Sequence, residues 1–422
     1  MLDNNIRGIL AVTGSAAAIF WPGALTFGFS GVMSPFWEEM FNTGSGATGN
    51  TLFFLLFGVG IFMFFVGKWQ ERVGTRIMIT LGALICGLSL VIVANAVNIY
   101  MVYIWAFLNG MGVSFIYVPG LTTVQRWFPQ KRGLVSGIVN LMFGFSAATM
   151  VPLFSVLLET QGYMSMIYIT AAFTLIISLI SAQFTEVPER VKKVSKYQVI
   201  QNNFNLQNAD VNNSLTVAES VRTRSFWFLW LIWALQGAAG IAMVTNSVNF
   251  GLTRGMPMES AVLILTTFNV TNGLSRIITG YLSDIIGRNL TMSIAFFAAG
   301  GAYFILAYTY NLAAAAVLAA VVGFAFGTLF AVSAPLISDC FGLKHFGAIL
   351  GLQFTAFGFV AGLLGPSLSG YLLDTTGGNF IAIFSYLGIF CLLSGILVNY
   401  VVPPQLKEEK VAQSMGNLAG EN

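Results

Sequence analysis

Charged residues are scarce in this chain. Only 8% of its 422 residues are Asp, Glu, Lys or Arg, and there is one histidine, whereas hydrophobic residues make up 56%. A typical soluble domain is roughly a quarter charged, so this composition excludes a protein whose whole surface faces water. The apolar runs are 18 residues or longer, and they lack the ~10-residue alternation of barrel strands. The sequence therefore predicts an all-α polytopic membrane protein.

Chemical motifs are scarce as well. The three cysteines, Cys86, Cys340 and Cys391, have no metal-like spacing, and we expect them to pack in the interior. No nucleotide-binding loop occurs, and no Ser/His, Asp/Asp or His/Glu constellation lies in the apolar segments. The sequence thus disfavours an enzyme and an ATP-driven pump, and it predicts neither a metal ion nor a cofactor. A net charge of +3 is too small to indicate a nucleic-acid partner.

Apolar runs separated by charged or Gly/Pro clusters predict twelve transmembrane helices. They cover residues 8–35, 47–68, 75–95, 98–125, 131–158, 162–184, 225–250, 258–283, 289–309, 311–336, 344–372 and 377–402. The one long polar stretch falls between the sixth and seventh of these helices. We therefore predict two six-helix bundles at 1–186 and 225–403, joined by a linker at 187–224 and followed by a tail at 404–422.

The positions of Lys and Arg indicate how the chain is oriented. If both termini are cytoplasmic, Arg254 is the one basic residue in a loop on the outer side, and Arg276 lies inside the eighth helix. Every other Lys and Arg then falls on the cytoplasmic side, as the positive-inside rule requires. We expect a multi-pass protein of the cell (inner) membrane, embedded in the lipid bilayer, with a cytoplasmic linker and cytoplasmic termini.

The two halves of the chain repeat each other. The segment 67–76, GKWQERVGTR, follows the second helix, and the segment 280–288, GYLSDIIGR, follows the eighth, 213 residues later. Phe128 and Lys131 after the fourth helix are matched by Phe341 and Lys344 after the tenth, at the same offset. Two loops at one offset predict duplicated six-helix units. Such repeats, with a site at their interface near the bilayer midplane, are typical of transporters.

The repeated loop resembles the signature loop of the major facilitator superfamily. The stretch 126–137, RWFPQKRGLVSG, is similar to the corresponding stretch of monocarboxylate porters and oxalate/formate antiporters. The resemblance covers essentially the whole chain and is nearest to the bacterial monocarboxylate transporters. It implies the two-bundle fold of that superfamily, with the substrate site between helices 1, 4, 5, 7, 8, 10 and 11.

Four charged residues lie at the helix ends of the two repeated loops. They are Glu71, Arg72, Asp284 and Arg288. A carboxylate there can pair with an arginine or with the positive amino-terminal end of a neighbouring helix. Such contacts can hold the cytoplasmic side closed in one state and break in the other, so we predict that these residues act in gating. The alternative is that they are solvated loop charges that only set the orientation.

Arg276 is the residue on which the functional prediction depends. An arginine at a helix centre costs ~2.5–3.5 kcal/mol on insertion scales and normally faces the bundle interior with a partner. The acidic residues all fall in loops, tails or helix ends, so we expect an anion from outside the chain. Asn269, Asn272 and Thr279 share the helical stripe of Arg276, and a guanidinium matches a carboxylate in two parallel hydrogen bonds. The alternative is a structural arginine satisfied by backbone carbonyls or snorkelling to the membrane edge.

The resemblance adds further candidate residues. Oxalate-type relatives have a cavity tyrosine at the position of Tyr117 and another at the position of Phe27, where the hydroxyl is lost here. They also carry a lysine in helix 11 where this chain has Phe354 to Phe357, which favours a monocarboxylate over oxalate. Each aromatic residue is equally consistent with core or lipid-facing packing. The predicted substrate-binding residues are Arg276, Asn272, Tyr117, Phe27, Asn140, Phe330, Phe354 and Phe357.

The sequence gives fewer indications of proton coupling than of the anion site. Animal-type monocarboxylate porters have an aspartate at the position of Asn272, and asparagine cannot titrate. We interpret His345, at the start of helix 11, as a loop or gate residue rather than a proton relay. The remaining route is a substrate carboxylate that carries the proton itself.

Together these features predict a secondary transporter that moves a small monocarboxylate, such as lactate or pyruvate, together with a proton by alternating access. We expect the single chain to be the functional unit. Two alternatives stay open, namely a carboxylate/carboxylate antiporter of the oxalate/formate type and a membrane sensor that binds the anion without translocating it.

Overall fold

The computed structural model describes residues 4–128, 132–186, 214–342 and 345–404, and all the regular secondary structure in these ranges is helical. The first half contains α1 (Asn4–Ala24), η1 (Leu25–Phe29), α2 (Ser30–Met40), α3 (Ser45–Val73), α4 (Thr75–Ala94), α5 (Ile99–Trp127) and α6 (Arg132–Ala182). The second half contains α8 (Val217–Val221), α9 (Arg224–Thr253), α10 (Met258–Ile286), α11 (Arg288–Leu306), α12 (Leu312–Phe341), α13 (Phe346–Thr355), η2 (Ala356–Ala361), η3 (Leu363–Ser367), α14 (Leu368–Thr376), α15 (Phe380–Leu397) and η4 (Val398–Tyr400).

Eleven helical runs among the described residues are long and apolar enough to cross a membrane. One of them, 137–182, lies in α6 and is broken at Gly162, whose φ of 76° is a left-handed conformation that glycine tolerates best. Counting the two sides of this break separately gives twelve spans, which confirms the all-α, twelve-helix prediction. Most of the predicted linker lies outside the described residues, but its end contains α8, and the Leu215 amide donates to the Phe341 carbonyl.

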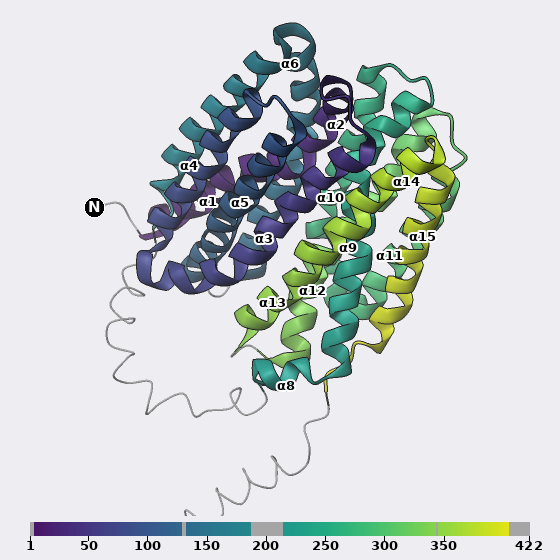
Figure 1. The fold of residues 1–422 in the computed structure, drawn as a ribbon. Coiled ribbons are helices and arrows are strands. Elements are labelled where there is room, and N and C mark those ends of the chain that lie inside the picture. The colour runs from purple at the N-terminus through teal and green to yellow at the C-terminus, as the bar shows by residue number, and fades with distance from the viewer. Residues whose placement is uncertain (1–3, 129–131, 187–213, 343–344, 405–422) are drawn as a thin grey trace, which may run out of the picture.

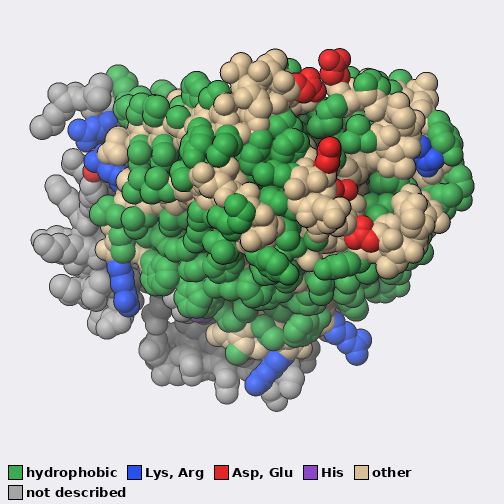
Figure 2. All heavy atoms as spheres, turned by 45° about the horizontal axis from the view of Figure 1, so that its top comes forward, with side chains coloured by type: hydrophobic (Ala, Val, Ile, Leu, Met, Phe, Trp, Pro, Cys, Tyr) green, Lys and Arg blue, Asp and Glu red, His purple; other side chains and the backbone are tan. Residues whose placement is uncertain are grey.

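The helices form two groups that follow the order of the chain. Figure 1 shows α1 to α6 on one side of the molecule and α9 to α15 on the other. We call the end that carries α8 the linker end, and the end that carries the loop between α2 and α3 the far end. In Figure 2 a broad hydrophobic belt separates Asp and Glu side chains on one side from most of the visible Lys and Arg on the other. This belt is the surface expected to contact lipid.

Two membrane-spanning helices contain π-helical segments. The first is α1–η1–α2, in which every residue of η1 is buried, and the second is α13–η2–η3–α14. Prolines accompany both: Pro22 precedes η1 by one turn, and Pro366 lies within η3. A proline removes one backbone donor from the helical ladder, and π segments are frequent at functional sites. These segments carry Phe27 and Phe357, two of the predicted site residues.

The two halves are joined by polar contacts at the far end. Asp374 of α14 accepts hydrogen bonds from the backbone amides of Ser45 and Gly46, at 2.8 and 2.9 Å, and so caps the amino terminus of α3. Glu38 of α2 accepts from Asn249 of α9 at 2.9 Å. The helices also touch closely here, because the Cα of Gly49 in α3 lies beside the Pro366 carbonyl. The far end is therefore closed in this conformation.

We predict that Gly49→Ala destabilises the protein, since the added methyl group would overlap the Pro366 carbonyl oxygen, which belongs to the backbone and cannot turn aside. Overpacking of this kind typically costs ~1–3 kcal/mol. The matched control is Gly301→Ala in α11, where an added Cβ meets nothing within 4 Å. Thermal unfolding of the purified protein should show a lower Tm for Gly49→Ala only. Equal Tm values for the two variants would contradict the close contact between α3 and η3.

Candidate functional site

Arg276 lies in the middle of α10 and is 4% exposed. Its Nη2 donates to Oδ1 of Asn272, one turn earlier in the same helix, at 3.3 Å. Its Nε and Nη1 have no hydrogen-bond partner within the described part of the chain, and no ion pair with a described carboxylate is present. A buried donor without a partner costs ~1–3 kcal/mol, and more when it is charged. The site therefore holds a cation with unused hydrogen-bonding capacity.

Aromatic rings from both halves flank this guanidinium. Its Cζ lies 4.6 Å from the ring centroid of Phe330 in α12 and 5.8 Å from that of Phe143 in α6. Both distances fall within the range of a cation–π interaction, which contributes about 0.5–2 kcal/mol. Phe330 and Phe143 thus stabilise the positive charge, but they do not satisfy its N–H groups. Those groups still need hydrogen-bond acceptors on the sides that the rings do not cover.

Small residues bring α6 and α10 together beside Arg276. A Cβ on Gly144 would lie 3.1 Å from Nε of Arg276 and 3.1 Å from Cα of Gly273. Gly273 in turn faces the backbone nitrogen of Phe145, 3.0 Å from the position its own Cβ would take. Helix backbones can approach this closely in a membrane only where side chains are small. The two halves therefore meet at the level of the arginine.

The polar stripe predicted on the eighth helix lies inside the protein. Asn269 and Asn272 are fully buried and Thr279 is 1% exposed, whereas Leu274 and Ile278 on other faces of α10 are 44% and 49% exposed. Thr279 donates to the Ser275 carbonyl, while Nδ2 of Asn272 has no partner among the residues described. Asn272 thus presents an unused donor one turn from the unused donors of Arg276.

The second half contributes an aromatic cluster to this region. Phe330 contacts Phe357 of η2 at 5.5 Å and Phe354 of α13 at 6.3 Å between centroids. Trp233 of α9 contacts all three rings, at 4.8 to 5.8 Å. The structure therefore brings Phe330, Phe354 and Phe357 together, buried or half-buried, on the side of Arg276 formed by the second half.

The first half contributes a smaller group. The Tyr117 hydroxyl donates to Oδ1 of Asn140 at 2.5 Å, and the Tyr117 ring lies 5.0 Å from that of Phe143. Phe27 contacts Phe143 at 5.2 Å and Phe326 of α12 at 5.8 Å, so it bridges the halves. The other seven predicted substrate-binding residues thus connect to Arg276 directly or through one or two shared rings. Their roles in binding stay predictions.

Two residues at the site were not predicted. Phe143 lies one turn after Asn140 on the same helix, so its position could have been inferred by extending the polar face of that helix. Trp233 has no comparable signal, because the stretch 226–235 of its helix is apolar on every side and most of the helix is buried. A helix of this kind gives no pattern that indicates which face meets the site.

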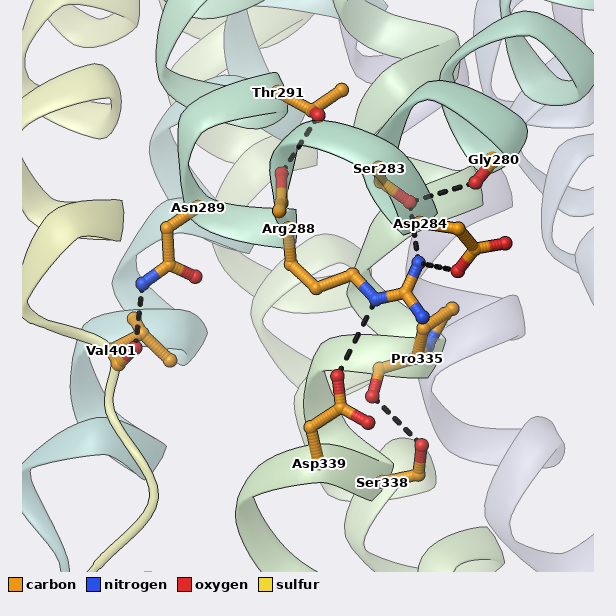
Figure 3. A network of polar contacts seen from close by, with 11 residues as sticks. Gly280, Ser283, Asp284, Arg288, Asn289, Thr291, Pro335, Ser338, Asp339 and Val401 are labelled. Atoms are coloured by element: carbon orange, nitrogen blue, oxygen red, sulfur yellow. Dashed lines mark hydrogen bonds and ion pairs between the residues drawn. The ribbon is translucent and has the colours of Figure 1, made fainter.

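The predicted gating residues of the second half form a network at the linker end, which Figure 3 shows. Arg288 at the start of α11 pairs with Asp284 of α10, donates through Nε to Asp339 of α12 at 3.4 Å, and donates through Nη1 to Ser283 at 2.6 Å. All these residues belong to the second half. In the first half Arg72 is exposed, and the side chain of Glu71 lies outside the described residues. His345 immediately precedes α13, also at the linker end.

Twelve spans in two halves, with a buried cation where the halves meet, define the architecture of a secondary transporter. A family model of the Major Facilitator Superfamily matches residues 16–265 and again residues 257–418. The chain therefore belongs to the Major Facilitator Superfamily.

Curated relatives are similar over most of their length. The Oxalate:formate antiporter of Oxalobacter formigenes is 27% identical over 342 residues, which are 80% of this chain and 78% of the relative. Monocarboxylate transporter 13 of Rattus norvegicus is 24% identical over 396 residues, 90% of this chain and 86% of the relative. Monocarboxylate transporter 11 of Homo sapiens is 26% identical over 349 residues, 80% and 70% respectively.

We predict that Asp284→Asn reduces the transport rate by roughly three- to tenfold, because an exposed pair of about 1 kcal/mol biases a two-state equilibrium about fivefold. Equilibrium affinity for the transported anion should stay within a few-fold of wild type, since Asp284 lies away from the site. The matched control is Glu259→Gln, which removes an exposed carboxylate at the other end of α10 and should leave the rate unchanged. Complete loss of anion binding in a folded Asp284→Asn protein would contradict a gating role.

Proposed function

We propose that this protein is a secondary transporter that moves a small monocarboxylate with a proton, and that Arg276 anchors the carboxylate. The observation that carries the proposal is the buried guanidinium whose Nε and Nη1 have no acceptor among the described residues. A carboxylate supplies two acceptor oxygens and one compensating charge. Nδ2 of Asn272 supplies a third donor beside the same position.

The charge balance favours one carboxylate over two. Arg276 is the one buried charged side chain among the residues whose side chains the structure describes. The position at which the oxalate-type resemblance implies a second base is occupied by Phe354 to Phe357, whose aromatic residues pack on Trp233. A dianion would thus bring a second charge into an apolar wall, where an unpaired charge is strongly disfavoured. The relatives named as monocarboxylate transporters support this choice.

The proposed proton route uses the substrate itself. Asn272 cannot titrate, and no described carboxylate forms an ion pair with Arg276. Protonation of the bound carboxylate would remove its negative charge and weaken its hydrogen bonds to the guanidinium. Release of the neutral acid would then carry the proton across the membrane with the substrate.

Exchange of two carboxylates is the second candidate, and the similarity to a protein named Oxalate:formate antiporter favours it. The two candidates differ in what drives uptake into proteoliposomes. Symport predicts uptake of labelled lactate driven by an acidic exterior, without internal substrate. Exchange predicts uptake that needs internal carboxylate and is insensitive to an imposed pH gradient.

We further propose that the linker end faces the cytoplasm of a cell with this protein in its inner membrane. Arg72, Arg76, Arg222 and Arg288 lie at the linker end, whereas Arg254 lies at the far end, which is the distribution that the positive-inside rule requires of a cytoplasmic linker end. A cysteine introduced at position 200 should react with a membrane-impermeant maleimide only after the membrane is opened. Reaction in intact cells would invert the proposed orientation.

We predict that Arg276→Gln abolishes uptake and counterflow of lactate, whereas Arg276→Lys retains part of the binding. Lysine keeps the positive charge but cannot form the two parallel hydrogen bonds that a guanidinium makes with a carboxylate. Truncating one partner of a buried charged pair costs ~2–5 kcal/mol, or roughly 30-fold to several thousand-fold in affinity. Counterflow in proteoliposomes with labelled monocarboxylates measures this loss.

The control is Arg254→Gln, because Arg254 at the far end packs on Tyr310 and donates to the Ala307 carbonyl, away from the site. This variant should retain counterflow. If folded Arg276→Gln exchanges any monocarboxylate at the wild-type rate, the anion site lies elsewhere and the arginine is structural.

A further inference from the structure

Asn269 of α10 is fully buried and has one amide atom without a partner. Its Nδ2 donates to the Phe27 carbonyl of η1 at 3.2 Å and to the Leu265 carbonyl at 3.0 Å. Its Oδ1 has no hydrogen-bond partner among the described residues. A buried acceptor left without a donor is costly, so a hydrogen-bond donor from outside the chain would relieve this cost.

The hydrogen bonds fix the orientation of the amide. Both N–H groups of Nδ2 face backbone carbonyls, so exchanging the positions of nitrogen and oxygen would set the side-chain oxygen against two other acceptors. The carbonyl of Phe27 is held by the π-helical segment of the other half. Oδ1 of Asn269 is therefore locked as an acceptor at the boundary between the two halves.

The buried polar atoms without a hydrogen-bond partner follow a fixed order along α10. Asn269 offers an acceptor, Asn272 offers a donor through Nδ2, and Arg276 offers donors through Nε and Nη1. Asn269 and Asn272 are about 4.5 Å apart along the helix axis, given a rise of ~1.5 Å per residue. The Arg276 guanidinium reaches back to Asn272, so the unpartnered donors and the unpartnered acceptor lie within about one helical turn of each other along the axis of α10.

We infer that the site selects 2-hydroxy monocarboxylates, with the carboxylate on Arg276 and Asn272 and the hydroxyl donating to Oδ1 of Asn269. This inference rests on the proposed function and specifies its substrate class. A hydroxyl on the carbon next to the carboxylate supplies the one donor that the acceptor lacks. The ketone oxygen of a 2-oxo acid has no proton and would face Oδ1 as a second acceptor. An unsubstituted acid would leave Oδ1 without a partner.

The test compares three acids of the same carbon skeleton, which are lactate, pyruvate and propionate. Each competes with labelled lactate for binding to the purified full-length protein. For the wild type, lactate should bind roughly tenfold more tightly than either of the other two, because a hydrogen bond that a buried polar group can make with only one of two ligands typically discriminates by about this factor.

Two variants separate the acceptor from the structural role of the amide. Asn269→Leu removes Oδ1 and also the hydrogen bond to Phe27, so it should weaken all three acids but reduce the preference for lactate to less than threefold. Asn269→Asp also loses the hydrogen bond to Phe27 and adds a charge that repels the anion, but it keeps an acceptor oxygen. It should therefore weaken all three acids while the preference for lactate persists.

The outcomes distinguish this inference from the proposed function. If the wild type binds none of the three acids, the proposed function itself is wrong. If the wild type binds them equally, or if Asn269→Leu keeps the full preference for lactate, the carboxylate anchor stands and the assignment of Asn269 is overturned.

Discussion

The arrangement of the site depends on one constraint, which is that a guanidinium removed from water must find charge and acceptors close by. Burial of an unpaired ion is very unfavourable. A structural arginine in a membrane protein therefore normally has an acidic partner or contact with water. Arg276 has no acidic partner among the described residues, and only 4% of it is exposed. Two aromatic faces and one amide oxygen hold the charge in place, and its remaining donors are left for a ligand.

The same constraint links binding to the conformational cycle. Phe143 and the backbone at Gly144 come from the first half, whereas Arg276 and Phe330 come from the second. Any rocking of one half against the other must change what surrounds the cation. At the far end, Asp374 and Glu38 join the halves, while the charged network around Arg288 at the linker end stays within the second half. A far end closed by contacts between the halves, together with a charged network at the linker end that stays within one half, is the pattern expected of a state that opens toward the linker end.

Much of the fold and the central residue could be predicted from the sequence. Twelve apolar runs, the repeat at an offset of 213 residues and the loop charges define the helices, because membrane insertion imposes a strong and local pattern. Arg276 was identifiable because a charge in such a run has a high cost. The stripe of Asn269 and Asn272 followed from helical periodicity.

The rest depends on contacts between helices that are far apart in sequence. Trp233 was missed because, among 8 tryptophans, composition and periodicity do not distinguish a ring near the cation from one in the core. Phe143 is one of 38 phenylalanines, and its one signal is that it lies a turn after Asn140. The π-helical segments at Phe27 and Phe357 were missed because they arise where prolines and neighbouring backbones disturb the helical ladder. The orientation of the Asn269 amide depends on a carbonyl more than 200 residues away, at Phe27.

The most direct test of the account observes the guanidinium itself. Protein labelled with 15N in its arginines gives side-chain Nε signals, and the signal of Arg276 is the one absent from Arg276→Lys. Addition of lactate should shift this Nε signal, and the Nε signal of Arg254 should not move. A lactate-saturated, transport-competent protein whose Arg276 Nε signal is unchanged would contradict the claim that the substrate carboxylate completes the hydrogen bonding of this arginine.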